Sequence, residues 1–377
     1  MTVLMPPIYA MIIVLYFGLF AMSFDFISGY TGYLSFGHAA FYGVGAYTIV
    51  LIANDKIPLL PPDTPYMISL IVAGLFAAIV ALAIGAVSFR RTTGVYFAMV
   101  TLGFAEISHV FIRDWRYLGS SPQDGISVTG MTEGFAIGIP YISSLQLQIG
   151  QLAGDSIENL LGLGIDLSTV TVSYYMIGLV VLVSYFVMKR ILNSPFGRVM
   201  IAIRGNENRA KALGYNTFRY KLGAFIISGF FAGVAGALLA GYHRSADPEL
   251  FFLLVTAFAL VAIIVGGTRT LAGALYGYLF YITLEEMFKL EEGGIIPYLE
   301  DLVGDAAMNT ELVGQWALDD ILMAFVAGRA ELYIGIIFVF FVLYLPRGIL
   351  GMIHIRLGST VESFVSSKIR NHRKWKR

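Results

Sequence analysis

The stretch from Lys189 to Lys221 reads KRILNSPFGRVMIAIRGNENRAKALGYNTFRYK and separates two long hydrophobic segments. Its 33 residues contain eight lysines and arginines but a single acid, Glu207. Short loops with this much positive charge stay on the cytoplasmic side of a membrane. The stretch therefore predicts the orientation of the whole chain.

The same stretch contains the plan of a short helix. Asn206 is a suitable N-cap, Glu207 in the first turn complements the helix dipole, and Gly214 offers a left-handed stop. Residues 207–213 would form two turns, on the order of 10 Å long. A short, capped and charged helix at the cytoplasmic face is suited to docking another protein. The alternative from charge alone is a solvated basic loop that holds lipid headgroups.

The composition is that of a membrane protein. Hydrophobic residues make up 57% of the 377-residue chain and charged residues only 13%, against about 25% in soluble domains. We predict an all-α, polytopic helical membrane protein with about eight or nine hydrophobic segments, some of them broken or re-entrant. The apolar segments are Ile8–Ala21, Phe36–Ala53, Tyr66–Phe89, Gly94–Phe111, Val170–Met188, Leu222–Tyr242, Phe251–Val265, Leu271–Leu284 and Leu332–Leu345.

The charges are distributed unevenly along the chain. Sixteen of the 25 basic residues lie in Lys189–Lys221 and Arg347–Arg377, and we expect both stretches to be cytoplasmic. Glu285–Glu331 carries eleven acids and two bases, and Ile112–Thr169 carries six acids and two bases. These two segments are expected outside, although acids themselves weigh little in orientation.

Several kinds of chemistry have no support in the sequence. The chain contains no cysteine, which excludes disulfides, thiolate metal sites and cysteine nucleophiles. The five histidines are scattered, with no pair at metal-ligand spacing. We therefore expect no catalytic residue, no metal site, no cofactor bound by this chain and no nucleic-acid partner.

A glycine-rich segment interrupts the apolar region near the N-terminus. Ser28–Tyr47 reads SGYTGYLSFGHAAFYGVGAY and contains five glycines. Such a segment indicates either close approach of helix backbones or a broken helix. One interpretation is tight helix packing, with His38 as a hydrogen-bonded packing residue. The other is an unwound segment that lines a transport path.

This segment resembles the G-x-x-G-x-x-S-x-G-H-A-A-F-x-G-x-G-A-Y pattern of ABC importer permeases for branched-chain amino acids and amides, within which the LivM-like permeases are most similar. Further segments match in the same order. Gly94–Ile107 resembles the family's G-x-Y-F-A-x-x-T-L-x-F-A-E-x segment, and Leu345–Gly351 resembles its closing P-R-G-L/I-x-G. The resemblance covers about Ser28 to Gly351. We therefore divide the chain into a permease domain, 1–351, and a basic cytoplasmic tail, 352–377.

The basic stretch carries the most specific match. Residues 194–214 resemble the family's S-P-x-G-R-x-x-x-A-I-R-x-N-E-x-x-A-x-x-x-G block, in which E-x-x-A-x-x-x-G is the coupling motif that engages the ATPase subunits. The residues implied in coupling are Arg204, Glu207, Ala210 and Gly214. The resemblance thus favours the docking interpretation over a lipid-binding loop.

The residues expected to line the pathway or contact a second permease are Gly32, Ser35, Gly37, His38, Gly43 and Glu106. Glu106 is an acid within an apolar segment, where acids usually face a cavity or a partner charge. The alternative is a packing hydrogen-bond acceptor near the outer interface.

Two short apolar segments flank Gly266–Thr270 and resemble the family's G-G-x-G-T-x-x-G-x-x-x-G region, with Arg269 where a small residue is usual. They are either short spans or a re-entrant pair. The segment that follows, Glu285–Glu331, is longer and more acidic than the family pattern implies.

The resemblance implies a multi-pass subunit of the cytoplasmic membrane, surrounded by lipid, that imports branched-chain amino acids or related amino acids and amides. No G-x-x-x-x-G-K-[ST] phosphate loop occurs, so ATP and Mg would be used by separate subunits. The implied partners are a second homologous permease, two ATP-binding subunits and an extracytoplasmic substrate-binding protein. The alternatives are a urea or amide importer permease, a single-chain secondary transporter and a scaffold without transport activity.

Overall fold

The structure is a computed structural model that describes residues 7–58, 60, 64–118, 121–128, 136–137, 147–148, 169–288, 311–313, 316–317, 330–345 and 348–351. The predicted basic tail, 352–377, lies outside the described residues. So does most of the acidic segment 285–331 and most of the predicted outer loop after residue 128.

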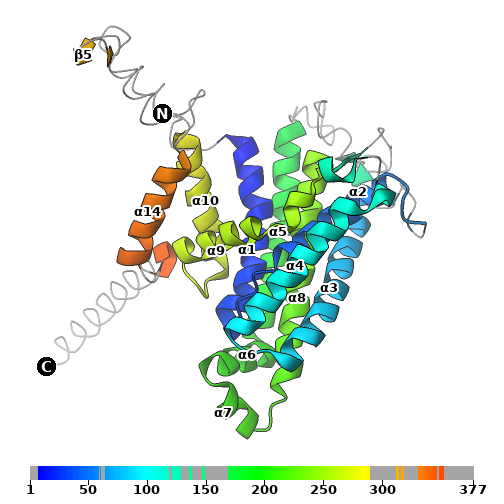
Figure 1. The fold of residues 1–377 in the computed structure, drawn as a ribbon, viewed down its shortest axis with the longest axis vertical. Coiled ribbons are helices and arrows are strands. Elements are labelled where there is room, and N and C mark those ends of the chain that lie inside the picture. Colours follow the sequence, from blue (N-terminus) through cyan, green and yellow to red (C-terminus); the bar gives the residue numbers. More distant parts are fainter. Residues whose placement is uncertain are drawn as a thin grey trace, which may run out of the picture.

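Among the residues that the structure describes, five helices are long and apolar enough to cross a membrane, which confirms the all-α polytopic class (Figure 1). They are α1 (Ile8–Thr31), α3 (Tyr66–Arg91), α4 (Val95–Asp114), α5 (Thr169–Asn193) and α8 (Thr217–His243). Each coincides with a predicted apolar segment because long uninterrupted apolar runs satisfy their backbone groups internally only as helices.

The remaining apolar segments form shorter helices. α2 (Ala39–Ala53) and α14 (Ala330–Tyr344) are each 15 residues long. α9 (Leu253–Gly266) and α10 (Leu271–Met287) meet at an angle of 107° across a four-residue break. In Figure 1, α9 runs across the bundle whereas α10 runs along it. This bend confirms the expectation of broken or re-entrant segments.

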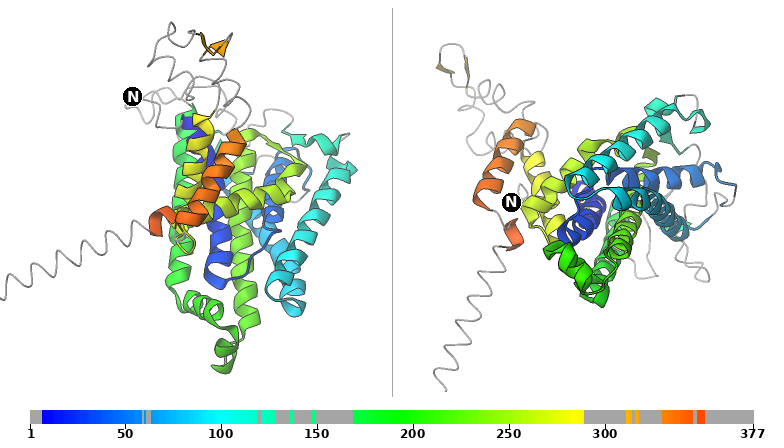
Figure 2. Two further views of the ribbon diagram at one scale, coloured as in Figure 1. Left: turned by 60° about the vertical axis from the view of Figure 1, so that its left-hand side comes forward. Right: turned by 60° about the horizontal axis from the view of Figure 1, so that its bottom comes forward.

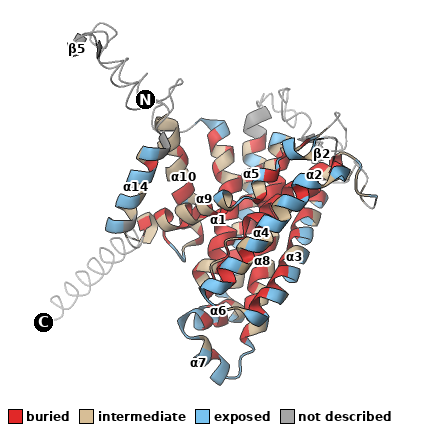
Figure 3. Ribbon diagram, in the orientation of Figure 1, coloured by how far each residue is buried: buried red, intermediate tan, exposed pale blue. Residues whose placement is uncertain are grey.

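Helix α8 packs against α1, α2 and α3 and forms the centre of the bundle. Small residues make this possible: a Cβ at Gly233 would meet the Ala77 side chain, and one at Gly236 would overlap the Tyr42 carbonyl. Such contacts let the helix backbones approach closely. Close packing matters in a membrane because lipid tails are as apolar as the side chains, so no hydrophobic effect drives the helices together. Figure 3 shows that the buried residues gather along these central helices, whereas α14 and the outer sides of α3 and α4 are exposed.

The two ends of the bundle differ. Two short helices, α6 (Pro195–Gly205) and α7 (Glu207–Ala212), project at one end, where α3 also ends with Arg90 and Arg91 (Figures 1 and 2). Arg90 and Arg91 therefore share this end of the bundle with the basic stretch, as the positive-inside rule favours. Residues 195–205 were expected to form a loop, but they form helix α6.

The opposite end carries short irregular elements. Among the described residues, three short 3-10 helices lie there: η1 (Arg116–Leu118), η2 (Pro122–Asp124) and η5 (Pro248–Phe251). Strand β1 (Ile126–Ser127) pairs antiparallel with β4 (Ser245–Ala246). Two further pairs are antiparallel: β2 (Ala136–Ile137) with β3 (Leu147–Gln148), and β5 (Glu311–Val313) with β6 (Trp316–Ala317).

Candidate functional site

Helix α7 has the predicted caps. The Asn206 Oδ1 accepts the backbone N–H of Arg209 at 2.9 Å, which satisfies one of the free amides of the first turn. Gly214 has φ = 87°, and the N–H of Tyr215 returns to the Ala210 carbonyl at 3.2 Å. The left-handed residue and the returning bond end the helix as expected.

Ala210 faces inward and the residues after it face outward. Ala210 is buried against Val199, Ile203 and Tyr220, so it fixes α7 on α6 and α8. Leu213 is 72% exposed, Tyr215 two residues later is exposed, and Ile201 is exposed on α6. Four basic residues are exposed on the same two helices: Arg198, Arg204, Arg209 and Lys211. We call this exposed set of apolar and basic side chains the α6–α7 surface.

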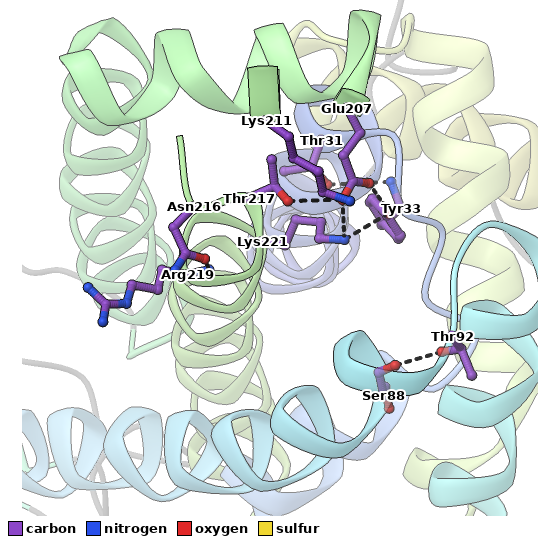
Figure 4. A network of polar contacts seen from close by, with 10 residues as sticks. All are labelled: Thr31, Tyr33, Ser88, Thr92, Glu207, Lys211, Asn216, Thr217, Arg219 and Lys221. Atoms are coloured by element: carbon purple, nitrogen blue, oxygen red, sulfur yellow. Dashed lines mark hydrogen bonds and ion pairs between the residues drawn. The ribbon is translucent and has the colours of Figure 1, made fainter. Parts of the chain in front are cut away.

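Glu207 points back into the protein, where four side chains contact its carboxylate (Figure 4). Tyr33 donates its hydroxyl to Oε2 at 2.6 Å. Oε1 accepts a hydrogen bond from Thr217 Oγ1 and forms ion pairs with Lys211 Nζ and Lys221 Nζ, each at 3.0 Å. The Lys221 ammonium also donates to the Tyr33 hydroxyl at 3.0 Å. We call Tyr33, Glu207 and Lys221 the clasp, because they join α7, the start of α8 and the segment after α1.

The electrostatics of the clasp keep Glu207 charged. Burial raises the pKa of Glu207, but the hydrogen bonds from Tyr33, Lys221 and Lys211 outweigh burial and lower the pKa to about 2. Burial and the bond to Glu207 raise the pKa of Tyr33, so its hydroxyl remains a donor. The Lys221 side chain is only 4% exposed, and a buried ammonium of this kind requires a partner charge.

The segment between α1 and α2 is non-helical, which agrees with the broken-helix alternative of the sequence interpretation. Gly32 ends α1 with φ = 80°, under the side chain of Arg204. Ser35 and His38 are fully buried. The first amide of α2, at Ala39, donates to Thr256 Oγ1 of α9 at 3.0 Å. Non-helical backbone at membrane depth is tolerated where protein groups satisfy it in this way.

The glycines of this segment allow close packing. A Cβ at Gly37 would overlap the backbone carbonyl of Thr101, and one at Gly43 would meet the ring of Phe251. His38 Nε2 lies 3.0 Å from Ser23 Oγ, as expected for a hydrogen-bonded packing residue. The packing interpretation is therefore observed directly. The role of these residues in a pathway or in contact with a second permease stays a prediction.

Asp25 is a functional candidate that the sequence analysis missed. It is fully buried in α1, and its Oδ1 accepts the backbone N–H of Arg269 at 3.0 Å. Tyr30 donates its hydroxyl to the Arg269 carbonyl at 2.6 Å. Arg269 has φ = 69°, so α1 side chains satisfy both backbone groups of a left-handed residue at the α9–α10 bend. An acid inside an apolar run was the signal that could have identified Asp25.

Glu106 lies apart from the clasp, on the outer side of α4. Its side chain is 55% exposed, and its Oε1 lies 3.6 Å from Nδ1 of His109. Exposed residues of the same helix surround it: Tyr96, Met99, Gly103, Ile107 and Val110. We call them, with Glu106, the α4 face. The exposure favours the interpretation in which Glu106 meets a cavity or partner over that of a packing acceptor.

A pocket of about 570 Å³ opens at the end of the bundle opposite α7. Its wall combines three carboxylates, Asp124, Asp247 and Glu249, with apolar side chains from the start of α9. Within the residues that the structure describes, no three His, Asp or Glu side chains gather as potential metal ligands.

These features define a multi-pass helical membrane protein in which a short capped helix is joined by charged side chains to a broken spanning segment. The chain belongs to the family described as "Branched-chain amino acid transport system / permease component", whose model matches residues 7–303. This is a family of transport permeases and not of enzymes.

Individual relatives agree with the family. The high-affinity branched-chain amino acid transport system permease protein LivM of Escherichia coli is 30% identical over 271 residues, 71% of this chain and 60% of the relative. LivM of Salmonella typhimurium matches equally well, and the ribose import permease protein RbsC of Haemophilus influenzae is 29% identical over 104 residues, 28% of this chain and 31% of RbsC. The chain spans about 60% of the length of the two LivM relatives. No solved structure matches significantly.

Proposed function

We propose that this chain is a membrane-spanning permease subunit of an ATP-driven importer of branched-chain amino acids or related amino acids and amides, in the cytoplasmic membrane. The observation that carries the proposal is the construction of α7. The family's coupling motif coincides with a helix that is capped at both ends, anchored by Ala210 and projected from the bundle.

The α6–α7 surface is the proposed contact with ATP-binding subunits. Its exposed Leu213 and Tyr215 would enter an apolar groove, and the basic residues around them suit a groove with an acidic rim. Because Glu207 and Ala210 both face inward, they shape the helix while the residues around them make the contact. ATP and Mg would be bound by those subunits, two of which would serve the pair of permeases.

The α4 face is the proposed contact with a second, homologous permease. A half-exposed carboxylate is costly against lipid, so Glu106 is better placed against a protein or a water-filled path. A Cβ added at Gly103, on the same face, would have no neighbouring atom within 4 Å, which leaves room for a close helix contact.

The pocket at the other end supports an amino-acid substrate. Its carboxylates suit an ammonium group, and its apolar wall, which includes Val255 and Phe258, suits a branched aliphatic side chain. An extracytoplasmic binding protein would deliver the substrate at this end. Urea or a simple amide has no ammonium group and would leave the three carboxylates without a use.

Reconstitution tests the proposal against its rival, a single-chain secondary transporter. Proteoliposomes that contain this permease, its second permease and the ATP-binding subunits should take up leucine only with ATP inside and loaded binding protein outside. Liposomes with this chain alone should show no uptake under a proton or sodium gradient. Gradient-driven uptake by the single chain would reject the proposal.

A separate experiment tests the orientation. The chain has no cysteine of its own, so a single introduced cysteine can be labelled selectively. Lys211→Cys should resist an impermeant thiol reagent in sealed right-side-out vesicles and react in inverted ones. Labelling from outside would place α7 on the wrong side for an ATPase contact.

A further inference from the structure

Tyr33 lies where α7 meets two spanning helices. Its hydroxyl contacts Glu207 and Lys221. Its ring makes edge contacts with Phe89 of α3 and Phe97 of α4, both with ring centroids 5.4 Å apart. One side chain therefore touches α7 through its hydroxyl and the ends of α3 and α4 through its ring.

Helix α4 is attached to α3 by a short link. Gly94 in that link has φ = 58° and no atom close to the position of a side chain, so it can act as a hinge. The segment 32–38 contacts α4 beyond the hinge twice, through Tyr33 on Phe97 and through Gly37 on the Thr101 carbonyl. The side of α4 away from these contacts carries Glu106.

The contact between Tyr33 and Glu207 is short and charge-assisted, which makes it stiffer than a neutral hydrogen bond. A displacement of α7 would therefore pull Tyr33 and, through its ring, the inner end of α4. Coupling of this kind travels through contiguous packed groups, and each contact from Glu207 to Phe97 is direct.

We propose that Tyr33 is a positioning residue that transmits movement of α7 to α4, so that the state of the ATP-binding subunits sets the position of the face that meets the second permease. This inference rests on the proposed function. It assigns a role to the hydroxyl of Tyr33, which lies outside the family's coupling motif.

Tyr33→Phe tests the inference because it removes the hydroxyl and keeps the ring between Phe89 and Phe97. In reconstituted full complex, the maximal uptake rate should fall about tenfold, the factor for a charge-assisted bond worth roughly 1.4 kcal/mol. The KM for loaded binding protein and the basal ATP hydrolysis should not change. ATP consumed per substrate should rise. A purely structural defect would lower assembled complex and hydrolysis together.

Tyr47→Phe is the matched control. The Tyr47 hydroxyl is buried and has no hydrogen-bond partner among the described residues, so its removal should leave uptake at the wild-type level. Glu207→Gln should lower uptake less when added to Tyr33→Phe than when introduced into the wild type, because both changes act on the same link. Additive losses, or wild-type uptake by Tyr33→Phe, would overturn the inference.

A distance measurement decides the inference even if the complex proves unable to transport. Spin labels at Ala212→Cys on α7 and Met99→Cys on α4 should change their separation when ATP-bound ATPase subunits bind the permease pair. In Tyr33→Phe the ATPase subunits should bind with unchanged affinity while the separation stays fixed. An equal change in label separation in the wild type and in Tyr33→Phe, or no change in the wild type, would show that Tyr33 does not transmit the movement of α7 to α4. Absence of ATP-driven uptake by the wild type would count against the proposed function alone.

Discussion

Glu207 and Glu106 are two glutamates of one chain with opposite surroundings. Glu207 is 21% exposed and receives bonds from Tyr33, Thr217, Lys211 and Lys221. Glu106 is 55% exposed, with His109 beside it at 3.6 Å. The chain thus satisfies one carboxylate by itself and leaves the other to its surroundings. Glu207 therefore organises contacts within this subunit, and the exposure of Glu106 supports the proposed contact with a second permease.

Two glycines show the same contrast. A side chain at Gly37 would overlap the backbone of α4 at Thr101. A side chain at Gly103, on α4 itself, would project into open space. Gly37 therefore serves packing within the subunit, whereas the open space at Gly103 supports the proposed helix contact at the surface. Substitutions at matched pairs of residues can separate the two uses.

The largest effect is expected for leucine at the two glycines. Gly37→Leu forces the segment 32–38 away from α4, which should cost about 3 kcal/mol or more and prevent accumulation of folded permease. Gly103→Leu should leave the isolated permease folded but block its association with the second permease. Size-exclusion chromatography and co-purification measure the two outcomes. Folded Gly37→Leu at normal yield would contradict the packing role.

Next in size is the loss of the clasp carboxylate. Glu207→Leu leaves the Lys221 ammonium buried without its main counter-charge, which should destabilise the isolated permease by about 1–3 kcal/mol. Glu106→Leu serves as the matched control and should not lower the stability. Thermal unfolding in one detergent compares them. Equal loss of stability in both variants would erase the distinction between the two glutamates.

The sequence predicts these sites unevenly, for identifiable reasons. The caps of α7 and the break after α1 could be predicted because Asn206, Gly214 and the glycine run act through local backbone chemistry. The clasp could not, because Tyr33 and Lys221 are 188 residues apart and meet only through packing.

Helix α6 could have been predicted, since Ser194 and Pro195 form a typical helix start. The angle between α9 and α10 depends on Asp25 and Tyr30 of α1 and is not contained in the local pattern. Local chemistry thus specifies where helices begin and end, whereas long-range contacts specify how broken segments are held.

A smaller effect is expected at Glu106 in the assembled pair. Glu106→Gln keeps a hydrogen-bonding group on the α4 face and removes its charge, so association with the second permease should weaken without a change in the fold. A fall in affinity of about threefold to tenfold is reasonable for one partly exposed polar contact. Fluorescence titration of the two permeases in lipid nanodiscs measures this affinity. Ser108→Ala, on the same helix, provides a control whose hydroxyl bonds within α4.

The smallest effect is the pH dependence of the clasp. The folded pKa of Glu207, about 2, lies below its ordinary value of 4.5, so the stabilising contribution of its charge is complete above pH 4.5 and is lost as the pH falls toward 2. The difference in unfolding temperature between wild type and Glu207→Gln should therefore be constant from pH 5 to 8 and shrink below about pH 4.5. Glu106→Gln should differ little from the wild type throughout this range. If the difference in unfolding temperature between wild type and Glu207→Gln were unchanged at about pH 3, the carboxylate would contribute through its shape and not through its charge. The electrostatic contrast between Glu207 and Glu106 would then be wrong.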